Sequence, residues 1–275
     1  MPIRVVADSN CDLPPELVAR YDILIIPSLL NMGGQTYLDG VEISRDEFYR
    51  RLPQLNPLPT TAAPASGVFE ETFRRCGRAQ VVCITLASAF SAIYNAARLG
   101  AEPLGEQVTL VDSQQASMGM GWQVLAAAET AHAGASLPEV LAGIESVQRR
   151  LRLYAALDTV EYLRRGGRAS LVSALMSGLL QIKPVLEVRA GQVSTIAKVR
   201  TQARARDELI ARVKALGPLA RLAVLHTAFE AGARELVEQL APCSAEPPLI
   251  AEVTAVIGTH IGPGALAVVP VMKET

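Results

Sequence analysis

Short apolar runs alternate with longer amphipathic segments along the first half of the chain. An apolar run bounded by turn residues is typical of a buried strand, and apolar positions that recur with helical spacing are typical of a helix. The runs predict strands at residues 3–7, 23–30, 81–85 and 108–111. The amphipathic segments predict helices at residues 14–21, 44–52, 65–76 and 91–99, followed by two more between residues 120 and 150. Strands that alternate with helices predict a mainly parallel sheet with helices on both faces.

Local signals mark where some of these elements begin or stop. Ser44 and Glu47 have the spacing of a capping box, in which the hydroxyl and the carboxylate each accept a hydrogen bond from a free backbone N–H. A helix is therefore expected to begin at this serine. Gly33 and Gly34 predict a turn, and the proline-rich segment 53–64 predicts a loop.

The second half of the chain has a different pattern, because a β-hairpin follows its first helices. Two short strands at residues 185–188 and 193–199 flank a turn that contains Gly191. The other elements are a strand at 153–157, helices at 159–165 and 170–180, helices that end near 216 and 240, and strands at 222–225 and around 250 and 268. We therefore predict an α/β domain at residues 1–150 and an α+β domain with a mixed sheet at residues 151–275.

The composition excludes several classes of protein. Hydrophobic residues make up 50% of the 275 positions, which supports two domains. The net charge is -1 and no basic run contains aromatic residues, so nucleic acid is not an expected partner. The cysteines form no pair with metal-binding spacing, so we expect no zinc site and no disulfide framework. No cofactor is expected either. The apolar runs are too short to span a bilayer and the N-terminus lacks a signal-peptide layout, so we expect a cytoplasmic protein without stable membrane insertion.

Small polar residues follow three predicted strands of the first domain. They are Asp8 and Ser9 after the first strand, Thr85 and Ser88 after the third, and Asp112 and Ser113 after the fourth. Ligands of open parallel sheets bind beyond the carboxyl ends of the strands, so this edge is a candidate polar site. Each residue by itself is better interpreted as a cap for the next helix. Together they favour a ligand site along this edge.

One of the three histidines, His260, lies in a segment rich in glycine and proline, residues 259–265. Glycine adopts backbone angles that other residues avoid and proline fixes its own, so we expect a turn that holds the imidazole in one place. A lone histidine is more often structural than functional, and that interpretation is preferred for His132 and His226. For His260 the question stays open, because polar residues from distant loops can meet it in the fold.

Four further residues are candidates for contacts with an anion. Ser91 opens a predicted helix, where its hydroxyl lies beside free N–H groups that attract a carboxylate or phosphate oxygen. Thr61 lies just before another predicted helix start. Arg168 and Arg200 are candidate anion contacts or supporting residues. The alternative for the two hydroxyls is ordinary capping, and for Arg168 a surface position at a helix end.

Missing motifs favour binding over chemistry. The chain lacks the nucleophile elbow, the P-loop, the dinucleotide fingerprint and the paired-histidine zinc motif. A serine-type acyl hydrolase with Ser91 as nucleophile and His260 as base is the alternative function. A lipid-responsive regulator is a third, without a DNA-binding motif to support it. The uncharged segments 116–122 and 171–180 mix small residues with methionine, so they form either buried core or the walls of an apolar tunnel for an amphiphile with an anionic head.

An ordered set of motifs extends along nearly the whole chain. The set comprises segments 7–9, 37–40, 60–64, 88–94, 111–121, 157–159, 162–168, 182–186, 200–201 and 259–265. In this set and order the chain resembles the DegV family of bacterial fatty-acid-binding proteins. Each motif alone is modest, and their number and order make the match specific.

The resemblance implies a two-domain protein that binds one long-chain fatty acid, such as palmitate, between its domains. It implies that Thr61 and Ser91 hydrogen-bond the carboxylate and that His260 completes this polar network. It also implies that Arg168 and Arg200 support the network or a partner contact. The implied partner is a fatty-acid kinase, which makes an acyl phosphate for phospholipid synthesis. The protein is then a carrier of the substrate and not an enzyme.

The chain departs from the usual pattern of this family in two motifs. Ala62 and Ala63 replace a Ser-Gln pair after the threonine, and Ala92 replaces a glycine after the serine. Thr61 and Ser91 are kept through both changes. The departures therefore concern the details of the pocket and its preference for chain length.

Overall fold

The computed structural model describes residues 1–168 and 182–274, so the apolar helix expected at residues 170–180 lies outside the described residues. The α/β fold class predicted from the sequence is confirmed by a parallel four-stranded sheet and a mixed six-stranded sheet. The chain divides into two compact units. Unit 1 comprises Met1–Leu29 and Thr61–Arg149, and unit 2 comprises Leu30–Thr60 and Arg150–Thr275. In the described part of the chain, no helix combines the length and apolar character needed to cross a membrane.

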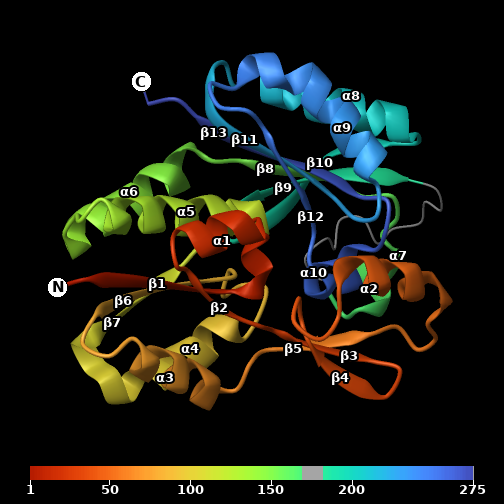
Figure 1. Ribbon diagram of the computed structural model, residues 1–275. Helices are drawn as coiled ribbons and strands as arrows, with labels where there is room; N and C mark the ends of the chain where they lie inside the picture. The colour runs from red at the N-terminus through yellow and green to blue at the C-terminus, as the bar shows by residue number, and fades with distance from the viewer. Residues whose placement is uncertain (169–181, 275) are drawn as a thin grey trace. The chain divides into compact units, whose positions relative to one another are not determined.

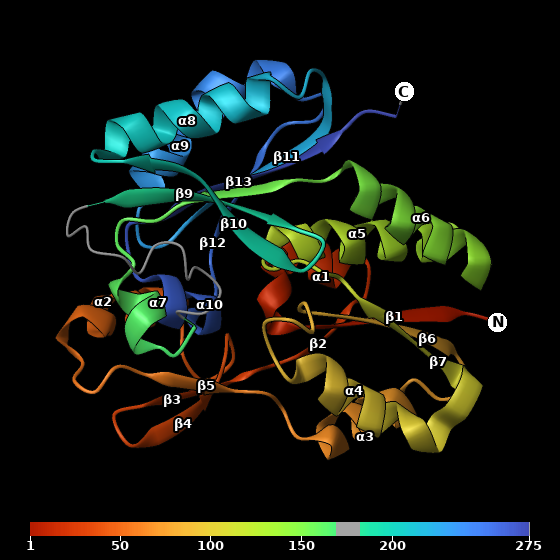
Figure 2. The ribbon, with the colours of Figure 1, turned by 180° about the vertical axis from the view of Figure 1, so that it is seen from behind.

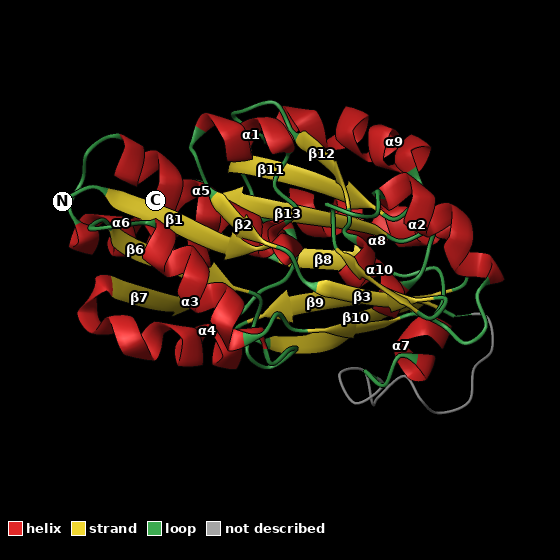
Figure 3. Ribbon diagram, turned by 60° about the horizontal axis from the view of Figure 1, so that its bottom comes forward, coloured by secondary structure: helices red, strands yellow, loops and turns green. Residues whose placement is uncertain are grey.

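The sheet of unit 1 has the order β2-β1-β6-β7, and all its neighbours are parallel. Figure 3 shows these strands running in the same direction. They are β1 (Ile3–Asp8), β2 (Leu24–Ile26), β6 (Gln80–Thr85) and β7 (Val108–Asp112). Two helices, α3 (Ser66–Arg75) and α4 (Ile93–Ala101), lie on one face (Figures 1 and 2). The other face carries α1 (Pro15–Arg20), α5 (Met118–His132) and α6 (Leu137–Arg150).

Burial on both faces explains the continuous apolar runs that predicted this sheet. Val6 and Val82 are both fully buried at 0% exposure, as expected when helices cover a parallel sheet on both sides. The single strand expected at residues 23–30 is wrong, because β2 ends at Ile26 and a new strand begins at Leu29. Pro27 lies at the break, and a proline has no N–H to donate to a strand ladder.

The main sheet of unit 2 has the order β10-β9-β8-β13-β11-β12. Its strands are β8 (Leu153–Ala156), β9 (Lys183–Arg189), β10 (Gln192–Val199), β11 (Leu219–His226), β12 (Leu249–Glu252) and β13 (Leu266–Met272). Strands β9 and β10 form the predicted antiparallel hairpin, whereas β11 and β12 are parallel. The mixed sheet expected for the second half is therefore confirmed.

Helices cover this sheet on two faces (Figures 1 and 2). One face carries α8 (Gln202–Lys214) and α9 (Glu230–Leu240), and the other carries α7 (Glu161–Arg165) and α10 (Ala255–Ile261). Strand β8 illustrates the alternation, because Tyr154 and Ala156 join the cluster under α8 and α9. The intervening Ala155 packs instead with Leu163 and Ile261 from α7 and α10. A strand's side chains alternate between faces, so one short strand contributes to both cores.

The segment Leu30–Thr60 belongs to unit 2 by its contacts, although we assigned residues 1–150 to an N-terminal domain. It supplies α2 (Arg45–Arg51) and most of a small sheet, β4-β3-β5. The strands of that sheet are β3 (Leu29–Met32), β4 (Gln35–Leu38) and β5 (Thr60–Ala62). The loop expected from the prolines at residues 53–64 is therefore only partly correct, because Thr60–Ala62 form strand β5. The domain limits 1–150 and 151–275 stay a prediction.

Four short 3₁₀ turns complete the elements of the described chain. They are η1 (Ser9–Cys11), η2 (Leu52–Gln54), η3 (Glu102–Gln107) and η5 (Ala241–Cys243). The first of them follows β1 directly and places the polar residues at that strand's carboxyl end.

Candidate functional site

The carboxylates at the carboxyl edge of the unit 1 sheet bind backbone and side chains of their own fold. Asp8 accepts hydrogen bonds from the backbone N of Asn10 at 3.0 Å and from the backbone N of Leu86 at 2.7 Å. Asp112 accepts from the backbone N of Ser88 at 3.2 Å and from its hydroxyl. The edge therefore gathers these residues as expected. Asp8 caps the 3₁₀ turn η1, as the capping interpretation predicts, whereas Asp112 binds Ser88 and caps none of the described helices.

Ser91 and Thr61 both belong to unit 1. The hydroxyl of Ser91 accepts from the backbone N of Ile93 at 3.4 Å, so it lies at the start of α4, which begins two residues later than predicted. Thr61 is half-buried in β5. His260 and Arg168 belong to unit 2. The convergence of these residues on one carboxylate, and the position of a ligand between the domains, stay predictions.

His260 lies in the last turn of α10, which corrects the turn expected at residues 259–265. The hydroxyl of Thr254 accepts from the backbone N of Val256 at 3.1 Å and of Ile257 at 3.4 Å, and so begins the helix. The glycine-rich turn starts only at Gly262, whose φ of 74° ends the helix. The imidazole is therefore held by a helix and by what packs against that helix.

The segment after α7 packs against His260. A Cβ added at Gly166 would lie 2.8 Å from Nδ1 of His260. Arg168 donates to the backbone O of Gly166 at 3.3 Å. Burial, with the positive charge of Arg168 as a second cause, lowers the pKa of His260 to about 4, so the imidazole is neutral at pH 7. The structure thus brings together two predicted site residues, His260 and Arg168, and adds Gly166, which belongs to the motif at residues 162–168.

Arg200 has a different position from Arg168. It precedes Thr201, whose hydroxyl accepts from the backbone N of Arg204 at 3.2 Å and caps α8. Its supporting role stays a prediction.

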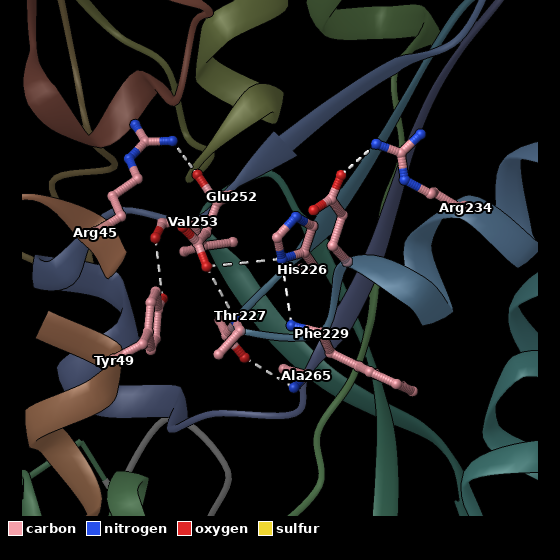
Figure 4. Close-up of polar contacts among 11 residues, drawn as sticks. Arg45, Tyr49, His226, Thr227, Phe229, Arg234, Glu252, Val253 and Ala265 are labelled. Carbon is pink, nitrogen blue, oxygen red and sulfur yellow. Dashed lines mark hydrogen bonds and ion pairs between the residues drawn. The ribbon is translucent and has the colours of Figure 1, made fainter. Parts of the chain in front are cut away.

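Helix α2 holds the connection that leads into α10 (Figure 4). Tyr49 donates from its hydroxyl to the backbone O of Val253 at 2.9 Å, and Arg45 donates to the backbone O of Glu252. Gly258 allows the approach, because a Cβ there would lie 2.8 Å from Cζ of Tyr49. The segment Leu30–Thr60 therefore fixes the helix that carries the candidate histidine.

The turn that follows α10 is held from two sides. Thr227 accepts at its hydroxyl from the backbone N of Ala265 at 2.8 Å (Figure 4). On the other side, Gln202 donates to a carboxylate oxygen of Asp158 at 2.5 Å and to the backbone O of Gly264 at 3.1 Å. Asp158 also pairs with Lys183. Both ends of the His260 helix are thus anchored within unit 2.

His226 and Glu252 lie side by side at the ends of the neighbouring strands β11 and β12 (Figure 4). Nδ1 of His226 accepts from the backbone N of Phe229 at 3.4 Å and lies 3.8 Å from the carboxylate of Glu252. Burial lowers the pKa of His226 and raises that of Glu252. Both shifts favour neutral forms, which fits the structural interpretation of His226. The ring of His132 packs edge-on against Tyr21, which fits the same interpretation.

One of the two apolar segments proposed as tunnel walls packs inside unit 1. Met118 and Met120 at the start of α5 are fully buried at 0% exposure, and Trp122 is 3% exposed. A Cβ at Gly121 would overlap the backbone O of Cys11, so backbone and helix approach closely there. These contacts favour the core interpretation of residues 116–122. The second segment, 171–180, lies outside the described residues.

Within residues 1–168 and 182–274, no group of three or more His, Cys, Asp and Glu side chains lies close enough to hold a metal ion.

The molecule is an α/β protein with a parallel sheet in one unit, a mixed sheet in the other and a partly buried, neutral histidine at the end of α10. The model of the DegV family, described as a family of uncharacterised proteins, matches residues 2–273. The chain belongs to the DegV family, as the ordered motifs predicted.

Relatives of similar length support this assignment. A DegV domain-containing protein of Streptomyces coelicolor is 35% identical over 275 residues, which is 97% of each chain. A DegV domain-containing protein of Deinococcus radiodurans is 34% identical over 274 residues, which is 98% of each chain.

Solved structures match over nearly the whole chain. A DegV family protein from Thermus thermophilus, described by its fatty acid binding, has a TM-score of 0.92 and 31% identity, and the match covers 99% of this chain and 100% of that one. DegV from Bacillus subtilis, described as a fatty acid binding protein, has a TM-score of 0.87 and 28% identity with the same coverage. A Thermotoga maritima protein, described as revealing fatty acid binding function, has a TM-score of 0.86 and 26% identity, again with the same coverage.

Proposed function

We propose that this protein binds one long-chain fatty acid, such as palmitate. The observation that carries the proposal is the whole-chain match to the Thermus thermophilus structure, a family member described as binding a fatty acid. The Bacillus subtilis and Thermotoga maritima structures support the same ligand class. The ligand is therefore an amphiphile with an anionic head.

In this proposal Thr61, Ser91 and His260 hold the carboxylate. The side chains of Thr61 and Ser91 are half-buried, and the imidazole of His260 is neutral at pH 7. Each hydroxyl and the imidazole can donate one hydrogen bond to a carboxylate oxygen. Hydrogen bonds to a charged group are stronger than those between neutral groups. Burial of the acyl chain adds about 0.8 kcal/mol for each CH₂ group and supplies most of the affinity.

A second part of the proposal concerns what happens to the bound acid. The protein presents it to a fatty-acid kinase, which forms an acyl phosphate for phospholipid synthesis, and Arg168 and Arg200 support the head-group network or the kinase contact. The support for this part is the resemblance of the motifs that contain the two arginines, residues 162–168 and 200–201. In this role the protein carries a substrate and catalyses no step itself.

Native mass spectrometry of the purified protein, followed by extraction and identification of lipid, tests the binding proposal. We expect one fatty acid per chain, either co-purified or taken up on addition of palmitate. A protein that stays empty with added palmitate contradicts the proposal. Turnover of a chromogenic acyl ester that disappears in Ser91→Ala would instead establish the serine hydrolase with Ser91 and His260.

A further inference from the structure

Two neighbouring glycines after α7 differ in what their backbone requires. Gly167 has a φ of +73°, a conformation that side chains rarely adopt, so glycine is needed there for the chain itself. Gly166 has a φ of -81° and a ψ of 5°, which any residue adopts. The absence of a side chain at Gly166 therefore has its cause in the groups packed around it and not in its own φ and ψ.

Two groups approach Gly166 closely. A Cβ there would lie 2.9 Å from the backbone O of Tyr162 in α7, and 2.8 Å from Nδ1 and 3.6 Å from Cε1 of His260 on α10, so this edge of the ring rests against the glycine. Nδ1 is buried from solvent. The opposite edge of the imidazole, which carries Nε2, consequently points away from Gly166.

We propose that Gly166 is the positioning residue for His260, and that the contact directs Nε2 of the imidazole to the ligand carboxylate. The inference rests on the proposed function for its ligand, and on the glycine contact for its geometry. A neutral imidazole with its proton on Nε2 donates one hydrogen bond to a carboxylate oxygen. A methyl group at position 166 would displace the ring and turn that donor away.

Further contacts from the same segment keep α10 in this position. The ring of Tyr162 covers Gly262, where a Cβ would lie 2.8 Å from Cγ of the tyrosine. Asp158 packs on Gly264, where a Cβ would lie 3.2 Å from the aspartate Cβ. Residues 158–166 thus contact α10 and the following turn at three positions, His260, Gly262 and Gly264. Because α10 is held there, the imidazole has little room to move when a side chain is added at position 166.

The test is Gly166→Ala, with Gly143→Ala as the control. Gly143 lies within α6, and its added methyl would lie 3.4 Å from Oγ1 of Thr130, an ordinary contact. We expect the ¹⁵N resonances of ligand-free, histidine-labelled Gly166→Ala to show His260 titrating closer to 6.5 than to the value of about 4, with the titration of His226 unchanged. Palmitate affinity should fall roughly tenfold, and the control should match the wild type in both measurements.

Two measurements remain decisive if Gly166→Ala folds poorly. In the wild type we expect a nuclear Overhauser contact between Hε1 of His260 and the Hα protons of Gly166. In the His260→Ala background, Gly166→Ala should cost less stability than in the wild type, because the ring that the methyl displaces is gone and only the contact with the backbone O of Tyr162 is left.

An unchanged His260 titration in Gly166→Ala, a missing Overhauser contact, or equal destabilisation in both backgrounds would overturn the proposal. These readouts need no lipid, so a wild type that displays them but binds no palmitate overturns the proposed function and leaves the positioning role intact.

Discussion

At the scale of single residues, hydroxyl groups on unit 1 are the candidates for direct contact with the ligand. Thr61→Ala or Ser91→Ala removes one hydrogen bond to a carboxylate, so each should weaken palmitate binding by roughly 1–3 kcal/mol without unfolding the protein. Calorimetric titration with palmitate measures the change. Thr60→Ala is the matched control for Thr61, because successive side chains of β5 point to opposite sides. Ser194→Ala, at an exposed position of β10, is the matched control for Ser91→Ala. Full affinity in both test variants would remove these residues from the site.

His260 makes stability depend on pH. Its folded pKa of about 4 lies below the ordinary 6.5, so the unfolded chain binds the proton more readily. The contribution of His260 is fully present above pH 6.5 and is lost as the pH falls toward 4, up to about 3 kcal/mol. The lowered pKa of His226 acts in the same direction, and the raised pKa of Glu252 acts in the opposite one.

Urea unfolding at several pH values between 4 and 7 measures this dependence in wild type and His260→Asn. We expect a shallower loss of stability on acidification in the variant, because the contributions of His226 and Glu252 are common to both proteins. Parallel stability curves would show that His260 binds a proton equally well in the folded and unfolded states.

At the scale of elements, the approach of α10 to α2 depends on one glycine. Gly258→Ala would place a methyl group within 2.8 Å of the Tyr49 ring, and overpacking of this kind costs about 1–3 kcal/mol of unfolding free energy. Because the hydroxyl of Tyr49 is one of the atoms that the methyl meets, Tyr49→Phe should partly relieve the strain.

A double-mutant cycle measured by chemical denaturation tests this contact. The cost of Gly258→Ala should be smaller in the Tyr49→Phe background than in the wild type. Gly67→Ala, a helical glycine of α3 with open space around it, is the control and should leave stability nearly unchanged. Strictly additive effects of Gly258→Ala and Tyr49→Phe would refute the contact.

At the scale of the whole molecule, both units are built from two separate stretches of chain. The segment Leu30–Thr60 buries Phe48 and Tyr49 in a cluster that also contains Ala255 of α10. A fragment of residues 150–275 alone should therefore show faster hydrogen exchange in α10 than the full protein does, because it lacks the contacts of Tyr49 and Arg45.

Addition of a peptide of residues 30–60, or its fusion to the fragment, should restore protection in α10, whereas β9 and β10 should stay protected throughout. Amide exchange followed by mass spectrometry resolves the two regions. Equal protection of α10 with and without residues 30–60 would contradict this account of unit 2.

The sequence by itself determined the elements whose signals are local. Burial on both faces made the strands around Val6 and Val82 continuous apolar runs, the hydroxyl of Ser44 accepts from the backbone N of Glu47 at 3.2 Å as the capping spacing predicted, and the hairpin around Gly191 formed as expected. It also determined membership of the DegV family, because motif residues keep their identity and order in the chain whatever their position in space.

Only the tertiary structure decided what those elements contact. An apolar pattern predicts that Tyr49 is buried, but not that its hydroxyl meets the backbone of Val253 far along the chain. The sequence placed Gly166 in the motif at residues 162–168, but only the fold shows that His260 lies against this glycine. The hydrophobic periodicity of a sequence predicts whether a residue is buried or exposed. Which distant segment packs against that residue depends instead on the packing of the whole fold.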